Sequence, residues 1–280
     1  MCVSTQTNAA TNAGISSVDM VRRCEGDHCV WSEDELAIEE PLQIRLAGED
    51  VAVTMRTPGH DAELAIGFLY TEGVIQGKHH VEAVAHCPDH DGSTTNIVNV
   101  SPTERNLLEP GRWGRNFYAT SSCGLCGKTS ISQVRSRLPS PGSHLRVRLD
   151  TLYALEGKLR VAQYAFAQTG GMHAAALFDE AGELLALRED VGRHNAVDKV
   201  IGYAMLHDML PLEKHILLVS SRASFEIVQK ALMVGVSVMA ALSAPSSLAV
   251  ELAREAGMTL VAFLRRDRLN VYSGAEWVEP

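Results

Sequence analysis

Short apolar runs alternate with longer amphipathic stretches throughout the second half of the chain. The runs predict strands at residues 172–178, 184–188, 215–220, 236–241, 259–264 and 269–272. The stretches repeat apolar residues with helical spacing and predict helices at residues 149–166, 195–207, 224–234 and 246–256. Strands that alternate with helices of these lengths are typical of a three-layer α/β domain, here with a mixed sheet.

The first half of the chain has more strand-like runs than helical ones. Its predicted strands are residues 42–46, 51–57, 81–87 and 97–100, and its predicted helix is residues 62–72. A linker is expected at residues 104–113, which contain Pro110 and Gly111. These elements predict a small α+β domain at residues 34–115, followed by the α/β domain at residues 116–280.

Residues 1–33 show little periodicity, so we expect a disordered tail there. Cys24, His28 and Cys29 lie in this segment and carry side chains that bind metals. The gap between the two cysteines does not match a structural zinc site, and we favour a mobile tail in which these residues meet by chance.

Composition and charge narrow the class of protein. The 280 residues are 46% hydrophobic and 21% charged, which is enough for two ordinary globular domains. A net charge of −9 argues against a nucleic-acid coat, although a local basic pocket remains compatible with it. The longest apolar run, residues 231–242, is too short to span a bilayer, and residues 1–20 lack the pattern of a secretory signal. We therefore expect a cytoplasmic protein with neither nucleic acid nor membrane as partner.

The most reactive stretch of the sequence contains Cys123 and Cys126, each followed by glycine. A helix expected at residues 129–138 would direct its free N–H groups and the positive end of its dipole at this loop, and Lys128 adds a cation. These effects favour thiolate over thiol, and the thiolate is the nucleophilic form of cysteine. The loop is thus predicted to carry reactive sulfur.

The alternative for this loop is half of a structural zinc site, which needs a second cysteine pair of similar spacing. No such pair occurs among the other cysteines, which are Cys2, Cys24, Cys29 and Cys87. We favour reactive sulfur and expect no metal site.

Two groups of polar residues outside this loop suggest chemistry but have simpler interpretations. His60, Asp61 and Glu63 resemble an acid–base group, but acidic residues are favoured in a first helical turn, so a structural role is preferred. Four histidines surround a polar turn, where surface histidines are common: His79, His80, His86 and His90. We expect no metal there.

Four loops of the α/β domain carry groups that bind anions. They are residues 169–173, 190–195, 220–224 and 263–268, and they lie next to predicted strand ends. Serines at a helix start suit a phosphate, and arginine binds phosphate through its planar guanidinium group. The candidate ligand-binding residues are His173, Arg193, His194, Ser221, Arg222, Phe263, Leu264, Arg265, Arg266, Asp267 and Arg268. Together they predict a nucleotide-like ligand.

The order of helix, hairpin and α/β units is similar to the cytidine-deaminase-type fold. Zinc deaminases use His-x-Glu and Pro-Cys-x-x-Cys motifs. Here no histidine is followed two residues later by glutamate, and serine precedes Cys123. Deamination is therefore disfavoured.

Several motifs resemble one known family. They are Glu39-Glu-Pro-Leu, Thr57-Pro-Gly-His-Asp61, Ser122-Cys-Gly-Leu-Cys-Gly-Lys128, Arg188-Glu-Asp-Val-Gly-Arg-His-Asn195, Ser220-Ser-Arg-Ala-Ser-Phe225 and Ser243-Ala-Pro-Ser-Ser247. The chain from Ile38 to Tyr272 resembles the formate dehydrogenase accessory sulfurtransferase family (FdhD).

The resemblance implies a sulfur carrier. A cysteine desulfurase would hand sulfur to Cys123 as a persulfide, and Cys126 would assist or resolve it. The sulfur would pass to the molybdenum or tungsten bis-guanine-dinucleotide cofactor of formate dehydrogenase before that cofactor enters the enzyme. The resemblance further implies a homodimer with the cytidine-deaminase-like fold and a cofactor-binding segment at 263–268. GDP would mimic half of the cofactor.

Two other functional classes are compatible with these residues. A thiol–disulfide oxidoreductase also uses Cys-x-x-Cys, but normally in a thioredoxin-like setting without a nucleotide pocket. A non-catalytic chaperone that only holds the cofactor would need the pocket and could function without Cys123.

Overall fold

The computed structural model describes residues 16–88, 92, 96–103 and 142–280. The Cys-x-x-Cys loop, the expected linker at 104–113 and the helix expected at 129–138 lie outside the described residues.

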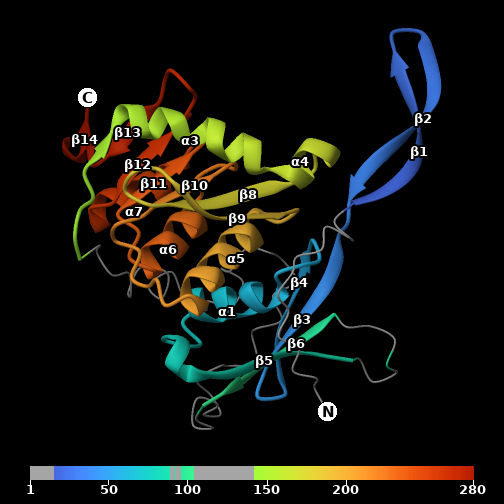
Figure 1. Cartoon of the computed structure of the whole chain (residues 1–280), viewed down its shortest axis with the longest axis horizontal. Coiled ribbons are helices and arrows are strands. Elements are labelled where there is room, and N and C mark those ends of the chain that lie inside the picture. Colours follow the sequence, from blue (N-terminus) through green and yellow to red (C-terminus); the bar gives the residue numbers. More distant parts are fainter. Residues whose placement is uncertain (1–15, 89–91, 93–95, 104–141) are drawn as a thin grey trace.

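A six-stranded mixed sheet forms the centre of the molecule (Figure 1). Its strands are β8 (His173–Phe178), β9 (Leu184–Asp190), β10 (Ile216–Val219), β11 (Val238–Ala241), β12 (Thr259–Ala262) and β13 (Asn270–Ser273). Their order is β13-β12-β11-β10-β8-β9. Strands β10, β11 and β12 are parallel, while β8 runs antiparallel to both of its neighbours and β13 runs antiparallel to β12. The mixed sheet expected from the sequence is confirmed.

Helices cover both faces of this sheet (Figure 1). Helices α5 (Arg193–Leu206), α6 (Phe225–Met233) and α7 (Ser247–Ala256) lie on one face, and α3 (Leu149–Ala162) lies on the other. The alternation of side chains along β10 produces two cores. Leu217 and Val219 join the cluster with α5, α6 and α7, whereas Ile216 and Leu218 join the cluster with α3.

The helix expected at residues 149–166 is in fact two helices. After α3 the backbone leaves the helical region at Gln163 (φ −79°, ψ 79°), and α4 (Tyr164–Thr169) begins. The Glu189 carboxylate accepts hydrogen bonds from the N–H groups of Ala165 and Phe166, at 2.8 Å each. This carboxylate satisfies the first turn of α4, which explains why a new helix starts there.

A second sheet is built from the strands expected in the first half of the chain. It contains β3 (Glu40–Leu46), β4 (Glu49–Arg56), β5 (Val81–Cys87) and β6 (Ile97–Pro102), in the order β4-β3-β6-β5. Helix α1 (Asp61–Thr71) packs on it through an apolar cluster that includes Leu42, Ile44, Leu64, Leu69 and Val98. Short elements complete the described chain: η1 (Lys78–His80), β7 (Val147–Arg148), η3 (Ala275–Trp277) and β14 (Val278–Glu279).

Helices α1 and α5 join the two sheets where they cross (Figure 1). Gly67 of α1 and Gly202 of α5 lie at the crossing. A Cβ atom at Gly67 would overlap the carbonyl oxygen of Asp198, and one at Gly202 would overlap that of Glu63. Both glycines therefore permit a backbone approach that no larger residue allows.

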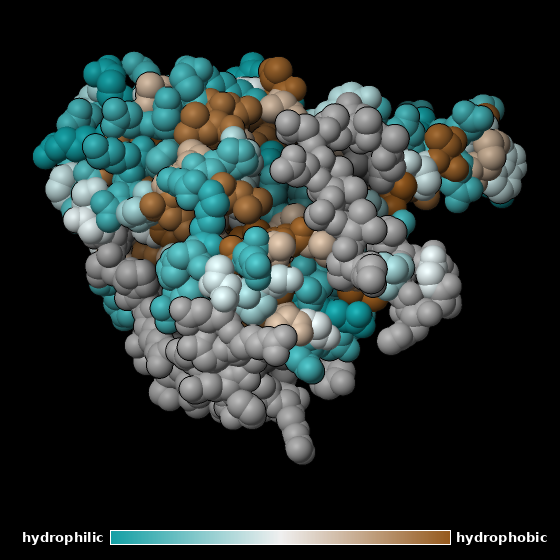
Figure 2. Space-filling model, turned by 60° about the horizontal axis from the view of Figure 1, so that its bottom comes forward, coloured by the Kyte–Doolittle hydropathy of each residue, from teal (hydrophilic) through white to brown (hydrophobic). Residues whose placement is uncertain are grey.

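The expectation that residues 1–33 are a disordered tail is wrong for residues 16–33. Strands β1 (Ser16–Glu25) and β2 (His28–Ala37) form an antiparallel hairpin that projects from the body (Figures 1 and 2). Gly26 has a positive φ of 58° in the two-residue turn, and a disulfide joins Cys24 to Cys29 across the strands. The missed signal was a Gly-Asp turn between two strand-like runs.

The hairpin exposes apolar side chains. Val18, Met20 and Trp31 are each more than half exposed, and hydrophobic atoms are visible on the projecting hairpin in Figure 2. Across the described chain, none of the helices has the length and apolar character needed to cross a membrane.

Candidate functional site

The predicted anion-binding loops converge at one edge of the six-stranded sheet. The carboxyl ends of β9, β10, β11 and β12 lie at this edge, and helices α5, α6 and α7 follow three of them. Strand β8 runs the other way, so its first residue, His173, pairs with the last residue of β9, Asp190. Ligands of open α/β sheets commonly bind at such an edge, and the four loops are placed for a shared ligand.

The loop after β12 combines structural and exposed residues. Leu264 is fully buried in the core on the α3 face. The Arg265 guanidinium donates hydrogen bonds to the carbonyl oxygens of Leu242 (2.6 Å) and Leu264 (2.7 Å). These two side chains build the loop and point away from a ligand on the outside.

The remaining residues of this loop face outward. Phe263 is 41% exposed although its φ of 53° lies in the left-handed region, where an aromatic residue is strained. Arg266, Asp267 and Arg268 are exposed. A strained, exposed aromatic beside two arginines is suited to contact a base and an anionic group.

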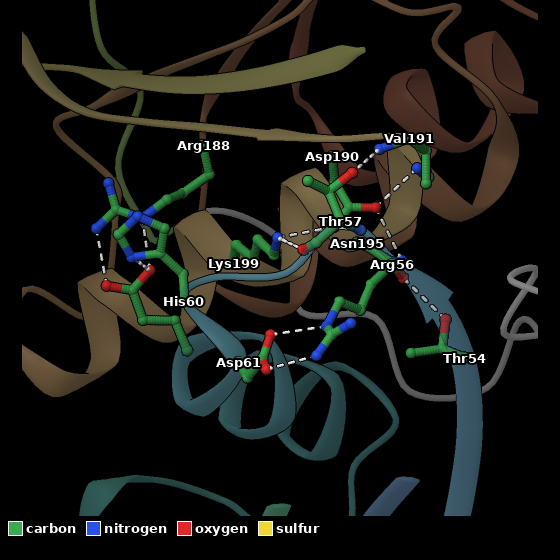
Figure 3. Close-up of polar contacts among 12 residues, drawn as sticks. Thr54, Arg56, Thr57, His60, Asp61, Arg188, Asp190, Val191, Asn195 and Lys199 are labelled. Carbon is green, nitrogen blue, oxygen red and sulfur yellow. Dashed lines mark hydrogen bonds and ion pairs between the residues drawn. The ribbon is translucent and has the colours of Figure 1, made fainter. Parts of the chain in front are cut away.

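A buried polar network fixes the start of α5 (Figure 3). The Asp190 carboxylate is fully buried and lies 2.8 Å from the Lys199 ammonium group. It also accepts hydrogen bonds from the N–H groups of Gly192 (2.8 Å) and Thr57 (3.2 Å) and from the side-chain amide of Asn195 (3.1 Å). The network thereby ties the end of β9 to the chain that follows β4.

Arg193 and His194 occupy the first turn of α5. The Arg193 Nε atom and the His194 Nε2 atom are buried without a hydrogen-bond partner. His194 Nε2 lies 3.8 Å from a Glu226 carboxylate oxygen, and this ring is the largest cause of a pKa for Glu226 of about 2. Burial lowers the pKa of His173, and nearby Arg193 and His194 lower it further. His173, Arg193 and His194 therefore lie close enough to influence one another electrostatically.

The polar residues of the loop after β10 differ in exposure and in hydrogen bonding. Ser221 is buried and donates to the carbonyl oxygen of Arg222 (3.1 Å), whereas the Arg222 side chain is exposed. Ser224 precedes α6 as its N-cap residue, but its hydroxyl makes no capping bond and is buried without a partner. Only Arg222 and Ser224 thus retain polar groups that a ligand at this edge could use.

The acidic residues at positions 61 and 63 have the structural role that the sequence favoured, because each is held by an arginine. The buried Arg56 guanidinium binds the Asp61 carboxylate with two hydrogen bonds of 2.9 Å (Figure 3). Arg188 does the same for Glu63 through its Nε and Nη2 atoms. Among the described residues, no group of three or more His, Cys, Asp and Glu is arranged around a metal position.

Several residues of this edge were not among the sequence-based candidates. Lys199 and Asp190 form a buried pair, Glu226 faces His194, and Ser224 carries an unpaired hydroxyl. Glu226 lies in the first turn of α6, directly after the candidate serine loop, and the preference for an acidic residue in a first helical turn was the available signal. Cys123 and Cys126 lie outside the described residues, and their placement relative to this edge stays a prediction.

Comparisons with known proteins agree with the motifs. The chain is 51% identical over 270 residues to the sulfur carrier protein FdhD of Mycobacterium tuberculosis, covering 91% of this chain and 96% of that protein. It is 41% identical over 266 residues to the sulfur carrier protein FdhD of Saccharolobus solfataricus, covering 94% and 97% of the two chains.

A solved structure shares the fold. The crystal structure of a formate dehydrogenase accessory protein from Desulfotalea psychrophila superposes with a TM-score of 0.76 and 22% identity, covering 94% of this chain and 99% of that one. The model of the FdhD/NarQ family matches residues 37–279, which include both sheets and the whole candidate edge. This chain belongs to the FdhD/NarQ family.

Proposed function

We propose that this protein is a sulfur carrier that serves formate dehydrogenase. It accepts sulfur from a cysteine desulfurase as a persulfide on Cys123 and passes it to the molybdenum bis-guanine-dinucleotide cofactor before that cofactor enters the enzyme. The observation that carries the proposal is the Cys-x-x-Cys loop within a chain that is about half identical to proteins named sulfur carrier protein FdhD.

The sulfur-loading step is a thiol exchange without net oxidation. The Cys123 thiolate attacks the terminal sulfur of the desulfurase persulfide, the S–S bond of that persulfide breaks, and the desulfurase cysteine leaves as a thiolate. A low pKa favours the attacking thiolate, and Cys126 assists or resolves the persulfide. The step makes the protein a sulfurtransferase.

The cargo in this proposal is multiply anionic and therefore suits the candidate edge. Exposed Arg222, Arg266 and Arg268 provide cations on a protein whose net charge is −9, and Arg193 adds a guanidinium group whose Nε atom has no hydrogen-bond partner among the described residues. Arginine binds phosphate through two parallel N–H donors. The proposal also includes a cytidine-deaminase-like fold, a homodimer and a cytoplasmic location.

Intact mass spectrometry after incubation with desulfurase and cysteine tests the proposal. The wild type should gain one sulfur atom, Cys123→Ala should gain none and should not activate formate dehydrogenase, and Cys126→Ala should be affected less. The double variant Cys24→Ala/Cys29→Ala, which changes only the hairpin disulfide, is the matched control and should load normally.

The same experiment separates the alternatives. Full activation of formate dehydrogenase by Cys123→Ala would favour a chaperone that holds the cofactor without carrying sulfur. Reduction of insulin disulfides without persulfide formation would favour an oxidoreductase.

A further inference from the structure

The hairpin of β1 and β2 stands apart from the rest of the fold. Within the described part of the chain it forms a two-stranded sheet of its own, and the element that it contacts most is α4. Figures 1 and 2 show that its distal end projects away from the body. A two-stranded hairpin on its own is only marginally stable in water, so the distal end depends on what joins its two strands.

The Cys24–Cys29 disulfide joins the strands at this distal end. Residues 26–27 form the turn, one pair of residues closes it, and Cys24 and Cys29 are the next pair. A covalent link restricts the open chain even when the closed loop is short, and for a loop of this length it favours the closed hairpin by about tenfold or more. The opening of the hairpin tip therefore depends on whether these two cysteines are oxidised.

The cysteine pair is accessible from solvent. Cys24 is exposed and Cys29 is partly exposed. Thiol–disulfide exchange requires that a thiolate reach one of the two sulfurs, and exposed disulfides are more labile than buried structural ones. In a cytoplasmic protein, the location proposed above, a disulfide is usually transient or redox-sensing.

The geometry of the tip does not favour a metal site. Successive side chains of a strand point to opposite faces, so His28 lies on the face opposite to Cys24 and Cys29. Side chains that point to opposite faces do not surround one ion, and among the described residues no group of metal-binding side chains was found. The chemistry left for the cysteine pair is that of thiol and disulfide.

We propose that Cys24 and Cys29 form a reversible redox site that closes the tip of the hairpin. A thiolate of a dithiol reductant attacks the sulfur of Cys24, the more exposed cysteine, and the S–S bond breaks so that Cys29 leaves as a thiolate and takes up a proton. The second thiolate of the reductant then attacks the mixed disulfide and releases Cys24. The two cysteines gain two electrons and two protons, and the reductant becomes a disulfide. Glutathione disulfide reverses the reaction and leaves as two glutathione thiols.

The disulfide shares its face of the hairpin with three exposed apolar side chains. The strand register places Val18, Met20 and Trp31 on this face, and each is more than half exposed. Trp31 follows Cys29 by two positions, which is about 7 Å along the strand. Oxidation therefore holds this apolar face in register, and reduction releases it. A disulfide this close also quenches indole fluorescence, so Trp31 reports on the redox state.

The redox state of the pair can be measured on one tryptic peptide. Trypsin cleaves after Arg23 and Arg45, and residues 24–45 contain no other cysteine. The folded full chain is incubated with increasing ratios of reduced to oxidised dithiothreitol, free thiols are blocked with a maleimide, and the peptide is weighed. It should pass from no label to two labels, and it should return to none when glutathione disulfide replaces the reductant. A pair that stays oxidised in millimolar dithiothreitol, or that does not form again, would overturn the site.

Hydrogen exchange tests whether the disulfide closes the tip. Reduction should speed the exchange of the inter-strand amides in residues 20–33 by about tenfold or more, leave β3 unchanged and raise the fluorescence of Trp31. The matched control is Cys24→Ser/Cys29→Ser, which keeps the other cysteines and should show fast exchange and high fluorescence in both redox buffers. Equal exchange in the two states of the wild type would reject the closing role, and a redox response that persists in the control would assign it to another cysteine. None of these outcomes depends on Cys123, so the site stands or falls separately from the sulfur-carrier function.

Discussion

Replacing a glycine by alanine at the crossing of α1 and α5 should destabilise the protein, whereas the same replacement inside α3 should stabilise it. Gly202 lies at the crossing, and Gly157 lies inside α3 with no heavy atom within 4 Å of an added Cβ. The variants Gly202→Ala and Gly157→Ala therefore make the same chemical change in a helix. Only the space around the new carbon differs.

The structure gives the size of the difference. Alanine is about 1 kcal/mol more favourable than glycine inside a helix, and this is the whole expected effect at Gly157. At Gly202 the new carbon would overlap the carbonyl oxygen of Glu63 and lie 2.6 Å from its carbonyl carbon, against an ordinary contact of about 3.5–4.0 Å. To restore an ordinary contact with this oxygen, the two helices would have to separate by about 1.5 Å. Overpacking costs about 1–3 kcal/mol, and a backbone obstacle belongs at the upper end. Subtracting the gain of about 1 kcal/mol in helix propensity, Gly202→Ala should lower the free energy of unfolding by about 2 kcal/mol.

Thermal unfolding followed by circular dichroism measures this difference. A loss of about 2 kcal/mol lowers the melting temperature by about 4–8 °C in a chain of this size, while Gly157→Ala should raise it by a few degrees. Equal melting temperatures for the two variants would refute the close helix crossing. A stabilised Gly202→Ala would refute it more strongly.

Three further predictions concern the buried charges and the metal content. His194 is the largest cause of the low pKa of Glu226, which is about 2. The ionised Glu226 carboxylate therefore stabilises the folded protein at any pH above the ordinary pKa of a glutamate, and this contribution is lost as the pH falls toward 2. Glu226→Gln should therefore show a flatter loss of stability in urea unfolding between about pH 5 and pH 2, and an unchanged slope would contradict the pairing. Lys199→Met should lower the free energy of unfolding by about 3–5 kcal/mol, because it leaves the buried Asp190 carboxylate without its cation. Adding Asp190→Asn should recover part of this loss, and no recovery in the double variant would contradict the buried ion pair. Elemental analysis should find no stoichiometric zinc, because only one cysteine pair has ligand spacing; one zinc per chain that disappears when both loop cysteines are replaced would reverse that conclusion.

The regular elements followed from the sequence because periodicity reports burial. The predicted strand at residues 97–100 and the helix at 246–256 differ from β6 and α7 by at most two residues at any end. Periodicity does not report single backbone angles. The strand predicted at 259–264 ends at Ala262 because Phe263 turns into the left-handed region, and the helix predicted at 149–166 breaks at Gln163.

The candidate edge was predictable in outline because the carboxyl ends of parallel strands lie on one side of a sheet. Which residues in the loops face a ligand was not predictable. Leu264 and Arg265 were candidates but serve the core and the loop backbone. Lys199 and Glu226 were missed because charged residues in helices are usually solvated, and only tertiary contacts show that Lys199 is buried.

Local pairing explains how an acidic protein can maintain a cationic edge. The carboxylates nearest the crossing are neutralised one by one: Asp190 by Lys199, Asp198 by Lys230, Asp61 by Arg56 and Glu63 by Arg188. Each pair is largely buried, so it contributes little field at the surface. Arg193 lies outside every one of these pairs. The net charge of −9 is therefore carried elsewhere on the protein, and the exposed side chains of Arg222, Arg266 and Arg268 remain at this edge for an anionic ligand.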